Sequence, residues 1–139
     1  MGREIFVVDD NIDYQFIFFK VLKGLEKSYP VKFFESAKAC HQHIETLHFT
    51  KASPMPGLVV LDLNMPGING LQLLKMLKNP KNNNVMIKHD IPVVIMSNDF
   101  SDYQVQQCYL AGANAVILKP FEFQILRGTV QSICEFWLD

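Results

Sequence analysis

The sequence predicts a three-layer α/β fold with a parallel sheet as its middle layer. Five short runs of apolar and β-branched residues alternate along the chain with longer segments in which apolar residues recur every three or four positions. Strands that alternate with helices form right-handed βαβ units, and these build a parallel sheet covered by helices on both faces. A length of 139 residues suits one such domain, and no repeat or linker divides it.

The predicted strands cover residues 5–8, 31–34, 58–61, 92–96 and 115–118. The first, third and fourth (IFVV, LVVL and PVVIM) are nearly continuous apolar runs, which is typical of strands buried on both faces. The second and fifth are weaker, and we expect them to lie nearer an edge of the sheet.

The segments between the strands carry helical periodicity. Predicted helices cover residues 14–25, 71–77, 101–110 and 123–137. Ser101 is the candidate N-cap of the third of these, and Pro80 stops the second. Two further segments, residues 50–57 and 79–90, are predicted to be surface loops.

Composition excludes several classes of function. The formal net charge is -1, from 13 Lys+Arg against 14 Asp+Glu, and only two residues are arginines. Direct binding of nucleic acid is therefore not expected. No apolar run reaches the ~18 residues of a membrane span, so we expect no membrane insertion. Three scattered cysteines form no disulfide framework, which favours a reduced, cytoplasmic location.

Polar residues stand where four of the predicted strands end. Asp9 and Asp10 follow the first strand, Asp62 the third, Ser97 the fourth and Lys119 the fifth. In an open parallel sheet, ligands bind beyond the carboxyl ends of the strands, so these side chains should converge. Clustered carboxylates repel one another unless a cation lies between them, and Mg²⁺ or Mn²⁺ suits oxygen ligands. A lysine and a serine beside them can bind phosphoryl oxygens, which indicates aspartyl-phosphate chemistry.

These residues sit in four motifs that occur in order along the chain. They are Val-Val-Asp9-Asp10-Asn11, Leu-Asp62-Leu-Asn64-Met65-Pro66-Gly67-Ile-Asn-Gly70, Met96-Ser97-Asn98 and Leu118-Lys119-Pro120-Phe121. With them the chain resembles the response-regulator receiver family over essentially its whole length. The resemblance implies one receiver domain over residues 1–139. It also implies a flavodoxin-like three-layer sandwich with a five-stranded parallel sheet in the order 2-1-3-4-5 and five helices.

The resemblance also implies a role for each site residue. Asp62 would accept a phosphoryl group from a histidine kinase or a histidine phosphotransfer protein. Ser97 and Lys119 would each bind a phosphoryl oxygen. A Mg²⁺ or Mn²⁺ ion would be held by Asp9, Asp10, Asp62 and the backbone carbonyl of Asn64.

Three positions near the expected site are predicted to modulate it. Val116 stands where the family usually has a switching Tyr or Phe, so coupling through a rotating ring is in doubt. Asn98 replaces a small residue after Ser97, and an altered phosphoryl lifetime is expected if its amide reaches over the site. Pro120 occupies the family's cis-proline position, where the cis form costs little.

Phe16 and Phe19 lie off the apolar face of the first helix, three residues apart and therefore neighbours. They either widen the buried stripe or form an exposed patch where a histidine-bearing helix bundle docks. Both alternatives are open at the level of sequence.

Two competing chemistries are disfavoured. Phosphatases of the haloacid dehalogenase type need an acid two residues after the nucleophile, and here that residue is Asn64, which cannot donate a proton as an acid does. The chain is therefore not expected to be an enzyme beyond Mg-dependent self-phosphorylation from small donors and slow autodephosphorylation. Cys40, His41 and His43 invite a zinc interpretation, but His41 points away from the other two on a helix, and packed or solvated side chains are favoured.

We expect the output of the domain to come from partner binding or phosphoryl relay, because the last predicted helix ends at residue 137. A homodimer is a further option, and the chain could also be one domain of a longer hybrid kinase. The alternative function is a receiver-like interaction module that works without phosphorylation. Val116 supports that alternative, whereas the intact set of acidic residues, serine and lysine argues against it.

Overall fold

The computed structural model describes residues 4–50, 54–78 and 91–139. Its strands are β1 (Ile5–Val8), β2 (Val31–Phe34), β3 (Leu58–Leu61), β4 (Val93–Ser97) and β5 (Ala115–Leu118). All neighbouring pairs are parallel and the order is β2-β1-β3-β4-β5, as predicted. The weaker second and fifth strands are the two edges. Only β4 differs from its predicted range, by one residue at each end, and the predicted loop at 79–90 lies outside the described residues.

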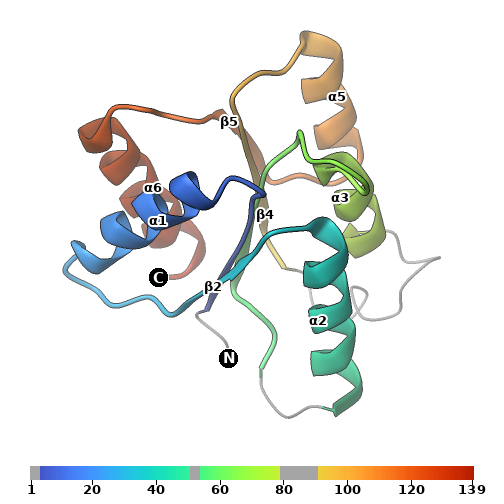
Figure 1. Cartoon of the computed structure of the whole chain (residues 1–139), viewed down its shortest axis with the longest axis horizontal. Coiled ribbons are helices and arrows are strands. Elements are labelled where there is room, and N and C mark those ends of the chain that lie inside the picture. The colour runs from blue at the N-terminus through green and yellow to red at the C-terminus, as the bar shows by residue number, and fades with distance from the viewer. Residues whose placement is uncertain (1–3, 51–53, 79–90) are drawn as a thin grey trace.

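Five helices cover the described sheet. They are α1 (Ile12–Lys23), α2 (Ala37–Thr50), α3 (Gly70–Lys78), α5 (Asp102–Leu110) and α6 (Phe123–Trp137). Helices α1 and α6 lie together on one face, and α2, α3 and α5 lie on the other (Figure 1). The predicted flavodoxin-like sandwich is confirmed. None of the helices in the described ranges is long and apolar enough to cross a membrane.

The core consists of two clusters because successive side chains of a strand point to opposite faces. In β1, Phe6 and Val8 join the cluster under α2, α3 and α5, whereas Ile5 and Val7 join the cluster under α1 and α6. Strands β1, β3 and β4 are buried along their whole length. Helices therefore hold the central strands from both sides, and the carboxyl ends of these strands meet at one rim.

Helix caps fix the segments next to that rim. The Asn11 side chain accepts a hydrogen bond from the backbone N–H of Tyr14, so α1 begins at Ile12, two residues before the predicted start. Ser101 and Gln104 form a capping box that starts α5, which confirms the predicted cap. Both helices are thereby anchored within a few residues of a strand end.

Gly70 begins α3 at a close backbone contact. A Cβ atom at this position would overlap the carbonyl oxygen of Asp62 and lie 2.8 Å from the Cα of Leu63. Only glycine fits such an approach without a backbone shift. The loop after Asp62 is therefore tied tightly to the first turn of α3.

Candidate functional site

The predicted polar residues converge beyond the carboxyl ends of the strands. Asp9, Asp62, Ser97 and Lys119 are all buried, and Asp10 is exposed beside them. One carboxylate oxygen from each of Asp9, Asp10 and Asp62 lies within 4.8 Å of the others. The three carboxylates therefore lie close together at this edge of the sheet, as expected.

Lys119 supplies the positive charge inside this group. Its Nζ lies 2.7 Å from Oδ2 of Asp9 and 3.5 Å from Oδ2 of Asp62. Its backbone N–H donates to the carbonyl of Ser97, which joins the ends of β4 and β5. The ammonium is therefore fixed between two carboxylates, closer to Asp9 than to Asp62.

The electrostatics of the site favour a divalent cation. Burial raises the pKa of Asp62, Lys119 lowers it, and Asp9 raises it again, with a net upward shift. Three carboxylates against one ammonium leave an excess of negative charge in a mostly buried place. The available donors are all oxygens, which is the ligand type of Mg²⁺ and Mn²⁺, so the residues present fit such an ion.

Asn64 connects the acceptor loop to Ser97. Its Nδ2 donates to Oγ of Ser97 at 3.1 Å and to the backbone carbonyl of Asp99 at 3.1 Å. The Ser97 hydroxyl in turn donates to that same carbonyl at 3.2 Å. Sequence reasoning assigned only the backbone of Asn64 to the site and missed its side chain, because a contact between residues 33 positions apart leaves no local pattern.

Asp9 is held by the start of α1. Its Oδ1 accepts from the backbone N–H of Asn11 at 2.9 Å, and its carbonyl accepts from Nε2 of Gln15 at 2.6 Å. Gln15 also donates to the carbonyl of Phe34 at 3.3 Å, so it ties the ends of β1 and β2 together. The position of Gln15 one turn into α1 is the only signal that the sequence offers for this role.

The comparisons with known proteins agree with this geometry. The family model described as "Response regulator receiver domain" matches residues 5–131. The chain belongs to the response regulator receiver family.

Relatives of this receiver domain include regulators of several lengths. The probable methanogenesis regulatory protein FilR2 of Methanothrix harundinacea is 27% identical over 134 residues, which are 96% of this chain and 83% of the relative. The chemotaxis protein CheY of Pseudomonas aeruginosa is 31% identical over 77 residues, 55% of this chain and 58% of the relative. The crystal structure of the Mn²⁺-bound response regulator Rcp1 superposes with a TM-score of 0.80 at 25% identity, covering 99% of this chain and 96% of that one.

The three predicted modulators of the receiver site occupy different environments. Asn98 is exposed in the turn after β4, and the amide that contacts Ser97 belongs to Asn64. Val116 is half-buried against the core cluster under α5, and its backbone N–H donates to the hydroxyl of Tyr109 at 3.2 Å. Sequence reasoning did not find this tyrosine.

The expectation of a cis bond before Pro120 is wrong for this structure. All described peptide bonds are trans. The trans form is the preferred one even before proline, by about 0.5–1 kcal/mol.

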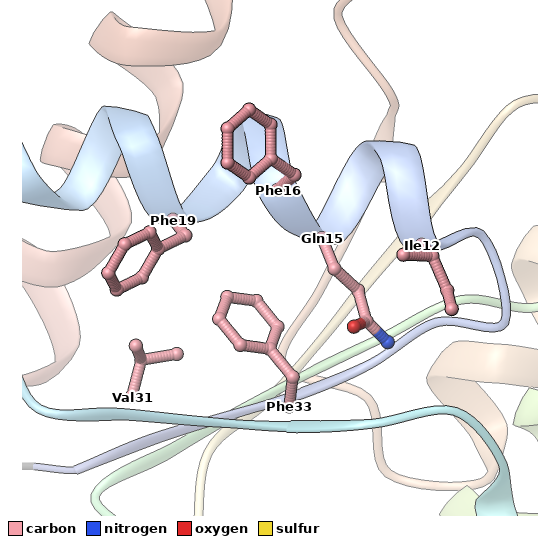
Figure 2. A pocket seen from close by; sticks show the side chains of 6 residues that line it. All are labelled: Ile12, Gln15, Phe16, Phe19, Val31 and Phe33. Atoms are coloured by element: carbon pink, nitrogen blue, oxygen red, sulfur yellow. The ribbon is translucent and has the colours of Figure 1, made fainter.

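Phe16 and Phe19 are exposed, 61% and 39% respectively, so the buried-stripe alternative is wrong. With four other residues they line a groove of about 330 Å³ between α1 and β2: Ile12, Gln15, Val31 and Phe33 (Figure 2). Lys20 lies over the Phe16 ring at 5.4 Å, and Lys23 lies over the Phe19 ring at 5.6 Å. We call this feature the α1–β2 groove.

The histidine-rich stretch of α2 forms no metal cluster with the residues that the structure describes. Cys40 is fully buried, and His41 lies 3.5 Å from the carboxylate of Glu45. His43 packs against the rings of Phe6 and Phe34. These contacts agree with packed side chains.

Proposed function

We propose that this receiver domain accepts a phosphoryl group on Asp62 from a histidine kinase or a histidine phosphotransfer protein and signals in the phosphorylated state. The observation that supports this is the buried Asp62 carboxylate beside the Lys119 ammonium, with Asp9 and Asp10 within metal-binding distance. Each group has a distinct part in such a transfer.

Asp9, Asp10, Asp62 and the backbone carbonyl of Asn64 would hold the cation, Mg²⁺ or Mn²⁺. When bound, the ion neutralises carboxylate charge and binds an oxygen of the incoming phosphoryl group. The anchoring of Asp9 by Asn11 and Gln15 fixes one of these ligands before any ion arrives.

In the transfer step, an oxygen of Asp62 forms a bond to phosphorus while the bond from phosphorus to the donor's histidine nitrogen breaks. The electron pair of that bond stays on the nitrogen, and the product is an acyl phosphate on Asp62. Lys119, whose ammonium lies 3.5 Å from the Asp62 carboxylate, would pair with a phosphoryl oxygen. Ser97 needs to exchange its contacts with Asn64 and Asp99 for a second phosphoryl oxygen.

The phosphorylated domain is expected to store the group and not to turn over substrate. Asn64 stands two residues after the acceptor, and an amide cannot donate a proton as a general acid does. We therefore propose slow autodephosphorylation, together with self-phosphorylation from small donors, and no further enzymatic activity. A cytoplasmic location accords with the free, buried state of the three cysteines.

The α1–β2 groove is proposed as the docking surface for the phosphodonor. It offers three exposed aliphatic or aromatic side chains of α1 beside the acidic rim, since Ile12 follows Asp10 by two residues. An amphipathic helix can place apolar side chains two or three at a time into a groove of this size. Lys20 and Lys23 flank it, so a helix with acidic residues beside its apolar face fits best.

The docking proposal is tested by replacing Phe16 and Phe19 with Ser. Phosphotransfer from the cognate histidine donor should slow roughly 10-fold or more, as expected when anchors of an interface are lost. Phosphorylation by acetyl phosphate should stay at the wild-type rate, because small donors need no docking surface. Equal loss with both donors would indicate damaged folding, and full activity with the histidine donor would refute the docking role.

The proposed acceptor is tested by intact-mass measurement after incubation with acetyl phosphate and Mg²⁺. The wild-type chain should gain the mass of one phosphoryl group, and the Asp62→Asn variant should gain none. A matched Asp102→Asn variant, which changes an exposed carboxylate at the start of α5, should behave as wild type. A wild-type chain that gains no mass would contradict the proposal.

That negative result would favour the second candidate, an interaction module that works without phosphorylation. The absence of an aromatic side chain at position 116, which is Val116, supports this interaction module. Such a module would capture the same partners with wild-type and Asp62→Asn protein, whereas a phosphorylation-dependent domain or homodimer would respond to the state of Asp62.

A further inference from the structure

Tyr14 carries a buried hydroxyl that has no hydrogen-bond partner among the described residues. The side chain is 6% exposed and projects from the first turn of α1. A buried polar group without a partner lowers stability, and buried hydroxyls in folded proteins are normally paired. Every other buried side-chain polar atom in the described ranges has a partner, so this hydroxyl calls for an explanation.

The ring of Tyr14 lies against the ammonium of the phosphoryl site. Nζ of Lys119 is 4.5 Å from the ring centroid, a distance at which the ring face attracts a cation. The ring also meets Phe121 edge to face, with centroids 6.3 Å apart. Tyr14 therefore contacts both the ammonium of the site and the loop that follows Lys119.

The hydroxyl is a donor under ordinary conditions. Burial, and after it the charges of Asp9 and Asp62, raise the pKa of Tyr14 above its usual value, so the phenol keeps its proton. The same two carboxylates show that the hydroxyl feels the negative charge of the site. A phosphoryl group on Asp62 would add three acceptor oxygens to this place.

We propose that Tyr14 is a positioning residue for phosphoryl transfer: its ring holds the Lys119 ammonium between Asp9 and Asp62, and its hydroxyl donates a hydrogen bond to the phosphoryl group. This inference rests on the proposed function of Asp62. The observation behind the second part is the buried hydroxyl, which has no hydrogen-bond partner among the described residues.

Two variants separate the ring from the hydroxyl. Tyr14→Phe keeps the ring over Lys119 and removes only the hydroxyl, whereas Tyr14→Leu removes both. Tyr103→Phe is the matched control, because this tyrosine lies on α5 and is 68% exposed. The three proteins and wild type are compared in thermal unfolding, in affinity for beryllofluoride with Mg²⁺ as a phosphoryl mimic, and in the dependence of phosphorylation rate on acetyl phosphate concentration.

Tyr14→Phe should unfold at a higher temperature than wild type, because an unpaired buried hydroxyl is gone. It should nevertheless bind beryllofluoride roughly threefold to tenfold more weakly, because one hydrogen bond to the mimic is lost. Tyr14→Leu should in addition lower the maximal phosphorylation rate about fivefold, since Lys119 loses its cation–π contact. In NMR spectra the Lys119 Cε protons should be shifted upfield by the ring in wild type and Tyr14→Phe, but not in Tyr14→Leu.

The two variants can refute the two parts of the proposal separately. If Tyr14→Phe gains stability and binds beryllofluoride as wild type does, the hydroxyl has no part in phosphoryl binding. If Tyr14→Leu folds and keeps the wild-type rate and affinity, the positioning role is refuted. A wild-type chain that accepts no phosphoryl group would remove the proposed function and this inference together, whereas a phosphorylated wild type with unaffected variants removes the inference alone.

Discussion

Asn64→Ala should move the domain toward its phosphoryl-binding state. The Asn64 amide donates to the Ser97 hydroxyl and to the Asp99 carbonyl, at 3.1 Å each. Ser97 also donates to Asp99, so its hydroxyl is held on the side of the loop after β4. It has to leave these partners before it can reach a phosphoryl oxygen. Replacing Asn64 with Ala removes one of the hydrogen bonds that hold the Ser97 hydroxyl in this position.

The size of the effect follows from the contacts that are lost. Each neutral hydrogen bond contributes about 0.5–1.5 kcal/mol net, and the exposure of Asn64 places these two toward the lower end. The bond to Ser97 is the one that breaks when the hydroxyl moves, so its loss, about 0.5 kcal/mol on the resting side, raises affinity for a phosphoryl mimic roughly twofold. The free energy of unfolding of the resting protein should fall by about 1 kcal/mol, because both bonds are lost.

The assay is titration with beryllofluoride and Mg²⁺, followed by the NMR signal of the Ser97 amide, beside urea unfolding without ligand. Gln106→Ala, an exposed change on α5, is the control and should alter neither quantity. The reasoning fails if Asn64→Ala binds the mimic more weakly than wild type while losing stability. That combination would mean that the amide serves the phosphorylated state and not the resting one.

Three further predictions concern neighbouring parts of the site. Because the pKa of Asp62 is raised above its ordinary 3.8, the folded state holds this proton more tightly than the unfolded state does. The protonated Asp62 therefore contributes stability that is complete below pH ~4 and is lost as pH rises through the raised pKa. Asp62→Asn should gain stability over wild type in urea unfolding, and this gain should grow from pH 4 to pH 8. Added Mg²⁺ should reduce the gain, because the ion stabilises the wild-type protein. Gly70→Ala should cost ~3 kcal/mol or more in the same assay, because its Cβ would overlap the Asp62 carbonyl, whereas Gly128→Ala, with open space around the new methyl, should cost no stability. Asn98→Ala should change the rate at which phosphorylated Asp62 decays, and an unchanged half-life by intact mass would rule out a part for that amide.

The strands and the site were predictable because both depend on local signals. A run such as LVVL can be buried on both faces only as an inner strand, and the polar residue after it then lies at the carboxyl edge of the sheet. Helix α2 carries a weaker signal. Its buried residues Cys40, Ile44 and Leu47 are interleaved with histidines, so periodicity alone gives it no clear range.

Other features depend on contacts that no local pattern encodes. The Asn64–Ser97 contact and the Tyr14–Lys119 contact join elements whose spacing is set only when the whole sheet has formed.

The different roles proposed for the three carboxylates follow from their surroundings. Asp9 lies 2.7 Å from the Lys119 ammonium and is anchored by α1, so its charge is well compensated and its position is fixed, as a metal ligand requires. Asp62 lies 3.5 Å from the same ammonium, and burial with neighbouring negative charge raises its pKa. A carboxylate of higher basicity is a better nucleophile toward phosphorus, so the less compensated member of the pair is the one suited to accept the group. Asp10 is exposed and can adjust to an arriving ion, which fits the metal-binding role proposed for it.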